Sequence, residues 1–422
     1  MQDRELDRRT FVGWTGAATG ALALAGCLGL GDDGNGGERD ENGDEQNRTE
    51  GERDETGEGE NGTGGDGPPF PEIEDKPDAV YVPTHRESMR ALEPVTAGDY
   101  RLAPMLSYPH PFWTVTGSDS EDDVQHVPPD QMRGVHMMFT LWDDRTGVVL
   151  PVDGGTVVRL YRDGTQVGSS QSMWSMLSQE MGFHFGDNVP LDDDGTYAVE
   201  VELPPLSTRT TGDLAGRFTE PETATFEFDY DQDFRDAVYD VEYFDEERWG
   251  ERGALEPMAH DRVPYSRLPE VADFPGTHLV APGEGSEGRP EATSELPRSG
   301  DAAILATVLE SGHRLADGDE RYLLVSPRTP YNRVPLPNTS LTATIERDGG
   351  SVTNEPVPLE QTIDSEYGLH YGASLADVRP GDAVTLTVRS PPQVARHQGY
   401  DTAFLEMPPI ELTVPEGSDD AE

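Results

Sequence analysis

Short runs in which apolar and polar residues alternate are the feature that most constrains the fold of this 422-residue chain. Such alternation places successive side chains on opposite faces of an extended strand. The runs are bounded by Gly, Pro, Asp and Asn, which favour turns. The clearest runs cover residues 156–161, 197–203, 225–228, 341–346 and 383–389. Asp-Gly dipeptides at 163–164 and 348–349 follow two of them and indicate hairpins. The sequence therefore predicts an all-β fold built from β-sandwiches.

Two parts of the chain resemble one another. Residues 181–189 and 367–375 both carry a Gly-x-His-aromatic-Gly pattern, centred on His184 and His370. In each copy a strand ending in Arg-Asp-Gly precedes the pattern, and a turn, a strand and a double proline follow it. Farther upstream, each copy has a Gly-Asp segment followed by a lone histidine, which is His110 or His313. Five matches in one order indicate an internal duplication.

The N-terminus has the features of an export signal. Arg8 and Arg9 precede an uncharged stretch, residues 11–26, which is too short to span a bilayer as a permanent helix. The stretch ends in Leu-Ala-Gly-Cys, which resembles the lipobox of prokaryotic lipoproteins, with Cys27 as the lipidated residue. We expect twin-arginine export and a lipid anchor on the extracytoplasmic face of the membrane. The alternative is a short uncleaved anchor with an incidental cysteine.

These features divide the chain into six predicted segments. They are a signal peptide at 1–27, a disordered acidic linker at 28–77, immunoglobulin-like β-sandwich domains at 78–230 and 299–416, a connector at 231–298 and an acidic tail at 417–422. The linker contains almost nothing apolar and cannot bury enough surface to offset its ordering entropy.

The charge is strongly negative, with 31 basic and 82 acidic residues and a formal net charge of −51. Only one basic residue is a lysine, Lys76, and this composition is typical of halophilic archaea. The excess of carboxylates argues against nucleic acid as a partner, because phosphates would be repelled. The single cysteine excludes disulfides within the chain and thiolate metal clusters.

Histidines and methionines are the residues that could carry chemistry. Imidazole with thioether suits copper, whereas imidazole with carboxylate suits iron, zinc or manganese. The predicted metal ligands are His110, Met181, His184, His313, His370 and His397. His184 and His370 are the strongest, because both copies of the repeat carry them between glycines. The alternatives are histidines that cap the rim of a sandwich and methionines that fill its core. Four further histidines lie in turn-like or connector contexts and are interpreted as bystanders: His85, His126, His260 and His278.

The Gly-x-His-aromatic-Gly pattern, the Gly-Thr-Tyr strand after it and a histidine after a double proline together resemble the periplasmic iron-transport-associated lipoprotein family. The resemblance implies a dimeric immunoglobulin-like protein that partners an iron permease and binds copper through histidines and a methionine. It implies that His184 or His370 is the central ligand, that His397 is the ligand after the double proline, and that His110 or His313 is the first-strand ligand. The first copy lacks the histidine after the prolines, and the family's methionine would fall near Leu177, beside Met176. Two domains in tandem would take the place of the family's homodimer.

Two functions follow from these observations. The first is a metal-binding accessory to iron or copper uptake, which could also form a homo-oligomer. The second is a cell-surface adhesion scaffold that binds no metal, and fold alone does not separate the two. We expect no enzyme, because the sequence has no nucleophile elbow, Walker loop, dinucleotide fingerprint or His-Glu-x-x-His motif.

Overall fold

The computed structural model describes residues 70–117, 123–152, 154–258, 262–283 and 290–416. The predicted signal peptide with Arg8, Arg9 and Cys27, most of the predicted linker, and the tail therefore lie outside the described residues. Residues 62–422 cluster as one compact unit.

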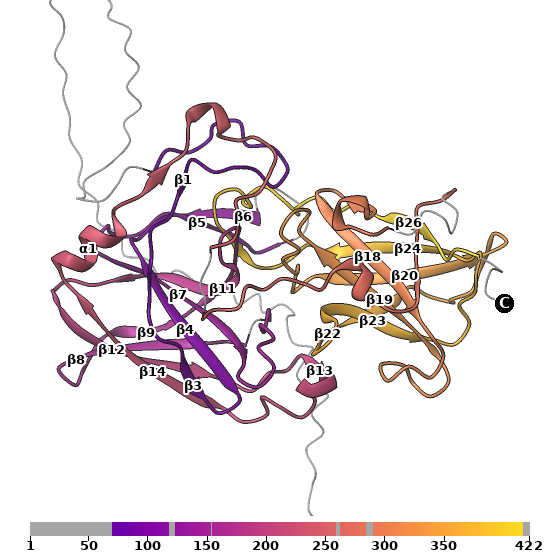
Figure 1. The fold of residues 1–422 in the computed structure, drawn as a ribbon, viewed down its shortest axis with the longest axis horizontal. Coiled ribbons are helices and arrows are strands. Elements are labelled where there is room, and N and C mark those ends of the chain that lie inside the picture. Colours follow the sequence, from indigo (N-terminus) through magenta and orange to yellow (C-terminus); the bar gives the residue numbers. More distant parts are fainter. Residues whose placement is uncertain (1–69, 118–122, 153, 259–261, 284–289, 417–422) are drawn as a thin grey trace, which may run out of the picture. The chain divides into compact units, whose positions relative to one another are not determined.

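A nine-stranded sheet forms the first part of the described fold and carries the candidate site (Figure 1). Its order is β2 (Arg90–Ala91), β4 (Tyr100–Ser107), β7 (Gly134–Asp143), β11 (Gly182–Pro190), β10 (Trp174–Ser178), β25 (Ala395–Arg396), β5 (Phe112–Val115) and β6 (Val124–Val127), with β3 (Val95–Ala97) beside β4. All of these pairs are antiparallel except β10 with β25, which is parallel.

A four-stranded sheet packs against one face of the first. Its order is β14 (Glu222–Tyr230), β12 (Gly195–Leu203), β8 (Val157–Arg162) and β9 (Thr165–Ser172). The ring of Phe139 on β7 stacks on that of Phe185 on β11, with 5.4 Å between their centroids, and both belong to the same core cluster as Val199 and Phe226. Burial of each such side chain contributes about 1.5–3 kcal/mol, so this face holds the two sheets together as a sandwich.

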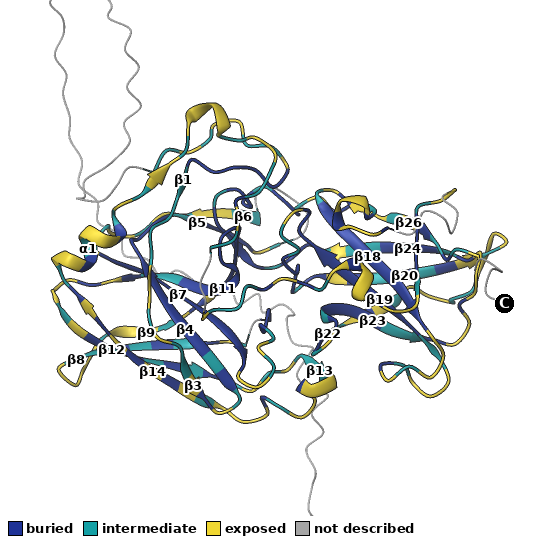
Figure 2. Cartoon of the chain, in the orientation of Figure 1, coloured by how far each residue is buried: buried dark blue, intermediate teal, exposed yellow. Residues whose placement is uncertain are grey.

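A curled sheet of eleven strands forms the second part of the described fold. Its order is β16 (Thr277–His278), β18 (Ala302–Leu309), β19 (Arg321–Arg328), β23 (Gly368–Leu375), β22 (Val357–Asp364), β20 (Ser340–Arg347), β24 (Ala383–Ser390) and β26 (Ile410–Thr413), with β13 (Arg209–Thr211), β17 (Arg298–Ser299) and β21 (Gly350–Ser351) beside β22, β18 and β20. Figure 2 shows β18 buried along its length, like β7 in the first sheet, whereas β9 is mostly exposed.

The remaining elements are short. They are a two-stranded sheet of β1 (His85–Arg86) and β15 (Glu242–Tyr243), the helix α1 (Gln232–Val238), and single 3₁₀ turns η2 (Gly212–Leu214), η3 (Glu246–Arg248), η4 (Val271–Asp273) and η6 (Thr293–Glu295). The Asp231 side chain caps α1 by accepting a hydrogen bond from the Phe234 N–H at 2.8 Å. Within the described part of the chain, no helix has the length and hydropathy needed to cross a bilayer.

The all-β prediction is confirmed. Four of the five alternating runs lie within an observed strand, and the fifth, 156–161, begins one residue before β8. Both predicted hairpins form, joining β8 to β9 and β20 to β21. Their Asp-Gly turns have positive φ at both residues, 51° and 74° at 163–164 and 50° and 77° at 348–349. This is the conformation that two-residue hairpin turns require. The boundaries of the two predicted domains stay a prediction, since one cluster of buried apolar side chains runs through both.

Each half of the fold lends a strand to the other. β25 from the second half lies parallel to β10, with Met176 opposite Ala395. β13 from the first half lies parallel to β22 in the same way, with Thr362 opposite Arg209. The two repeated motifs therefore occupy equivalent positions, β11 beside β10 and β23 beside β22.

A buried carboxylate, Asp364, fastens β13 to the second sheet. Its side chain is 0 % exposed and accepts hydrogen bonds from the Arg314 guanidinium, the Thr211 hydroxyl and the backbone N–H groups of Glu366 and Tyr367. Burial by itself would raise the pKa of Asp364, but these donors outweigh burial and hold the pKa well below its usual range.

We expect the Asp364 carboxylate to make the unfolding free energy depend on pH in the acid range. The pKa of Asp364 is lower in the folded protein than the value of about 3.9 in the unfolded chain, so its contribution is present above the unfolded pKa. That contribution is lost as the pH falls through the unfolded value toward the folded one. Between about pH 5 and pH 2 the unfolding free energy of Asp364→Asn should therefore fall less steeply than that of the unsubstituted protein. Exposed Glu227→Gln is the control, and equal slopes for Asp364→Asn and the unsubstituted protein would contradict the assignment.

Candidate metal site

The second face of the nine-stranded sheet carries histidines and methionines. Because side chains alternate along a strand, Met137 and Phe139 on β7 enter the sandwich core while His136 points to the other face. His136 lies opposite Asn188 on β11, so His184, four residues before Asn188, shares that face. The alternation of strand residues thus separates an apolar core from a layer of metal-ligating side chains.

The exchanged strand β25 brings a further imidazole into this layer. His397 follows β25, and its backbone N–H donates to the Leu177 carbonyl at 3.0 Å, which continues the parallel pairing with β10. The double proline at 391–392 precedes β25 and favours extended backbone there. As a result, His397 Nε2 lies 3.1 Å from His184 Nε2, although the two residues are 213 positions apart.

The hydrogen bonds of these two rings fix where their protons are. His184 Nδ1 lies 3.1 Å from the Gly182 carbonyl oxygen, and His397 Nδ1 lies 3.2 Å from Glu87 Oε1. Both oxygens only accept, so each Nδ1 carries a proton and donates. Burial lowers the pKa of His184 to about 3 and also lowers the pKa of His397, so both rings are neutral. Two Nε2 lone pairs therefore face each other.

Facing lone pairs at this separation suit a metal ion. Two imidazole nitrogens bound to one ion at about 2.0–2.1 Å with tetrahedral angles lie about 3.3 Å apart, close to the observed 3.1 Å. Without a cation, the two lone pairs repel each other in a buried environment. The Nδ1 bonds of His184 and His397 are of the kind that orients metal ligands, a backbone carbonyl for one ring and a carboxylate for the other.

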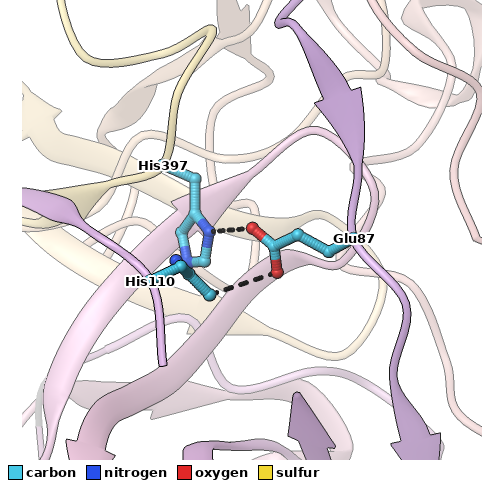
Figure 3. Close-up of side chains that lie close together, drawn as sticks. All are labelled: Glu87, His110 and His397. Carbon is cyan, nitrogen blue, oxygen red and sulfur yellow. Dashed lines mark hydrogen bonds and ion pairs between the residues drawn. The ribbon is translucent and has the colours of Figure 1, made fainter. Parts of the chain in front are cut away.

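Glu87 joins a third imidazole to this pair. Glu87 lies between β1 and β2, and its Oε2 is 3.2 Å from Nε2 of His110, a residue in the β4–β5 connection. Figure 3 shows the rings of His110 and His397 both directed at the Glu87 carboxylate. Ligand atoms of these three residues all lie within 4.8 Å of one another. They form one group in which a single ion could be bound.

The pKa values of Glu87 and His110 depend on one another. Burial by itself would raise the pKa of Glu87, but the imidazoles of His110 and His397 lower it well below its usual range. Burial by itself would lower the pKa of His110, but Glu87 outweighs it and raises that pKa. His110 Nδ1 lies 3.1 Å from the Pro111 carbonyl oxygen, so Nε2 is the ring nitrogen that faces Glu87. A proton on His110 Nε2 can therefore stand where a metal ion would bind.

A fourth imidazole, His136, is also oriented by a hydrogen bond at its Nδ1. The ring centroids of His110 and His136 are 4.0 Å apart. The Asn188 amide donates from Nδ2 to the His110 carbonyl at 2.9 Å, so its Oδ1, 3.0 Å from His136 Nδ1, accepts a proton from that ring. Burial lowers the pKa of His136 well below its usual value, and His136 Nε2 has no hydrogen-bond partner among the described residues.

A cavity of about 50 Å³ opens beside His110 and His397. Its lining includes His85, Glu87, Met89, His110, Met181 and His397. A cavity needs about 10–15 Å³ of such volume to hold one water molecule, so this one has room for an ion or a few water molecules. Burial lowers the pKa of His85 to about 4, which leaves its ring neutral at the cavity wall.

The structure brings together three of the six predicted ligands, His110, His184 and His397. Met181 lines the same cavity and packs with Met105 and Met138. The other two, in the second half of the fold, lie apart from this group. They are His370, whose Nε2 meets the Tyr322 hydroxyl at 3.4 Å, and His313, whose Nε2 meets the Tyr367 hydroxyl at 3.4 Å.

Sequence reasoning did not select two members of the group, Glu87 and His136, and it interpreted His85 as a bystander. Glu87 is one of 82 acidic residues, so composition gave no reason to choose it. His136 did have a signal, since it precedes two methionines in a strand whose alternate residues are apolar.

We expect Glu87→Gln to lower metal affinity by about 10–100-fold, the usual effect of removing a carboxylate that orients a ligating imidazole. The amide keeps the shape of the side chain but removes the charge that faces His110 and His397. Calorimetric titration with Cu(II) measures the change. Glu202→Gln, whose carboxylate pairs with Arg159 in the other sheet, is the matched control. An unchanged affinity in Glu87→Gln would contradict the proposed role.

The fold and the site together describe an all-β protein with a buried group of imidazoles around a carboxylate. A family model described as a domain of unknown function (DUF7350) matches residues 272–413. No curated protein matches the chain. Two solved structures of FetP from uropathogenic Escherichia coli are similar to part of it. A copper-bound variant is 19% identical, covering 34% of this chain and 97% of that chain with a TM-score of 0.25. The "as isolated" form is also 19% identical, covering 34% and 95% with a TM-score of 0.23.

Proposed function

We propose that the chain is a membrane-anchored lipoprotein that binds a transition-metal ion outside the cell and supports its uptake, with iron or copper as the cargo. The observation that carries the proposal is the pair of buried, neutral imidazoles, His184 and His397, whose Nε2 atoms face each other 3.1 Å apart. No hydrogen bond serves both nitrogens, since each ring has already placed its proton on Nδ1.

The donor set also restricts the kind of ion. Imidazoles with one carboxylate suit iron, zinc or copper and disfavour magnesium and calcium, which prefer oxygen ligands. The ionised Glu87 supplies one negative charge within reach of two imidazoles, which lowers the electrostatic cost of burying a cation. The resemblance of the repeated motif to iron-transport-associated lipoproteins favours iron or copper among these ions.

A binding protein for uptake must also release its ion. Glu87, His110 and His397 border a cavity rather than a sealed core. The wall of the cavity also carries His85 and Met89 as further donors. Ligand exchange between neighbouring donors gives an ion a route in and out. We propose a non-catalytic role for the chain, which passes its ion to a permease in the membrane.

The location in this proposal rests on the sequence. Arg8, Arg9 and Cys27 provide the export signal and the lipidation site, and the acidic linker would hold the folded part away from the membrane. A homo-oligomer stays compatible with this arrangement. The strand exchange through β13 and β25 supports the idea that the tandem halves replace a homodimer.

Metal analysis of two matched variants tests the proposal. The full chain, purified in high salt and loaded with Cu(II) or Fe(II), should retain one equivalent of a divalent ion after desalting. His184→Ala should lose that equivalent, whereas His370→Ala, the same change at the equivalent place in the second repeat, should retain it. Binding should also raise the melting temperature, because an ion at 100 times its Kd stabilises the folded state by about 2.7 kcal/mol. A chain that neither copper nor iron titrates would favour the surface-scaffold function instead.

A further inference from the structure

The Asn188 side chain holds the connection that carries His110. Asn188 Oδ1 accepts a hydrogen bond from the His110 backbone N–H at 3.2 Å, and Asn188 Nδ2 donates to the His110 carbonyl oxygen at 2.9 Å. One amide thus satisfies both backbone groups of a single residue, as a neighbouring strand would. His110 lies after β4 ends at Ser107 and before β5 begins at Phe112, beyond the ladders of both strands. The Asn188 amide therefore takes the place of strand pairing at this histidine.

The same amide orients the ring of His136. Asn188 Oδ1 lies 3.0 Å from His136 Nδ1, and an amide oxygen has two lone pairs, so it accepts from this ring and from the His110 backbone together. The His110 backbone also decides which way the amide points. A reversed amide would place its NH₂ group against an N–H and its oxygen against a carbonyl. With both lone pairs of Oδ1 engaged, Asn188 has none left for a metal ion.

The position of the His110 backbone determines what its ring can reach. His110 Nδ1 lies 3.1 Å from the Pro111 carbonyl oxygen, and His110 Nε2 lies 3.2 Å from Glu87 Oε2, the contact drawn in Figure 3. A binding group has to be held within about 0.5 Å of its working position. If the connection between β4 and β5 moved by more than this, His110 Nε2 would move with it, away from Glu87.

The second repeat uses the equivalent position for a similar but smaller contact. Ser374 on β23 is the counterpart of Asn188 on β11, four residues after the histidine of the repeated motif in each copy. The Ser374 hydroxyl accepts a hydrogen bond from the Asp317 backbone N–H at 2.8 Å, in the connection between β18 and β19. The hydroxyl thus holds one backbone group, whereas the Asn188 amide holds two backbone groups and a ring nitrogen. The copy with the group of imidazoles is the copy with the amide.

We propose that Asn188 is a positioning residue of the metal site, which aligns His110 so that its Nε2 can bind one ion together with Glu87 and His397. This role rests on the proposed function. Asn188 acts through His110 and does not bind the ion itself. Removing a group that orients a metal ligand usually lowers the affinity about 10–100-fold, and a loss of that size is expected at Asn188.

Substitution of Asn188 in the full chain tests this role. Asn188→Ser gives the first repeat the side chain of the second, and Asn188→Gln keeps the amide but displaces it by one methylene group. Each should lower the affinity for Cu(II) about 10–100-fold, measured by competition with a chelator. Pulsed electron paramagnetic resonance of bound Cu(II) counts the coordinated imidazoles and should find one fewer than in the unsubstituted protein. Ser374→Ala, which removes the equivalent hydroxyl, is the matched control and should change neither quantity.

A second comparison tests whether His110 carries the effect. In the His110→Ala background, Asn188→Ser should cause no further loss of affinity, because the residue that it positions is already absent. Melting temperatures of the metal-free variants show whether each is folded. A purely structural role would lower the melting temperature and leave the number of coordinated imidazoles unchanged.

The outcomes separate this role from the proposed function. An unchanged number of imidazoles in Asn188→Ser, or an equal loss of affinity with and without His110, would overturn the positioning role and leave the metal site in place. An unsubstituted protein that binds no Cu(II), the candidate divalent ion that such donors bind most tightly, would overturn the proposed function and the role of Asn188 together.

Discussion

Alanine in place of either His184 or His397 should lower the affinity for Cu(II) at least about 100-fold, since even the loss of a residue that only orients a ligand costs about 10–100-fold. The double variant should bind no more weakly than either single variant. The two Nε2 atoms face one space, so an ion that has lost one of them has lost the paired geometry that favours it. When two residues bind one ion together, the effects of substituting them are expected to be non-additive.

A double-mutant cycle measures this coupling. Dissociation constants for the two single variants and the double variant are obtained by competition with a chelator of known affinity, and His313→Ala serves as the control. His313 is a half-buried imidazole that contacts Tyr367 in the second half of the fold, so its removal should leave binding unchanged. Additive losses for His184→Ala and His397→Ala would mean that the two imidazoles hold different ions.

Phe139→Ala should destabilise the folded protein by about 3–5 kcal/mol, the usual effect of removing an aromatic side chain from a close-packed core. Phe139 is 0 % exposed and lies where the two sheets of the first sandwich meet. Its ring stacks on Phe185, the residue next to His184, so the cavity would form directly beneath the site.

Denaturant unfolding in constant high salt gives the free energy for this comparison. Phe139→Leu, which retains much of the buried volume, should cost less than Phe139→Ala. The metal-free protein should be used for both, because ion binding adds its own stabilisation. A loss below about 1 kcal/mol for Phe139→Ala would show that the core can collapse around the missing ring.

The strands and turns of this fold could be predicted because local rules govern them. Alternation located five strands, and the Asp-Gly pairs located two hairpins whose turns need positive φ at two successive residues. The repeated motif also drew attention to His184, which lies in β11. These features depend on residues close together in the sequence.

The site could be predicted only in part because its partners are distant in the sequence. The motif made His184 and His370 equally strong candidates for metal ligands. In the structure, His184 Nε2 meets an imidazole from the second half of the fold, whereas His370 Nε2 meets the hydroxyl of Tyr322. The register between β19 and β23 decides that difference, and no local pattern encodes it. Glu87 is likewise selected by its distance to two imidazoles rather than by its neighbours in the sequence.

The sequence separation between His184 and His397 has a consequence for biosynthesis. A ribosome must add 213 residues after His184 before His397 exists, and β25 must then insert beside β10. Nascent chains that have not reached His397 therefore lack the complete donor set. A metal ion bound by both imidazoles would mark molecules that have been translated through His397 and have paired β25 with β10.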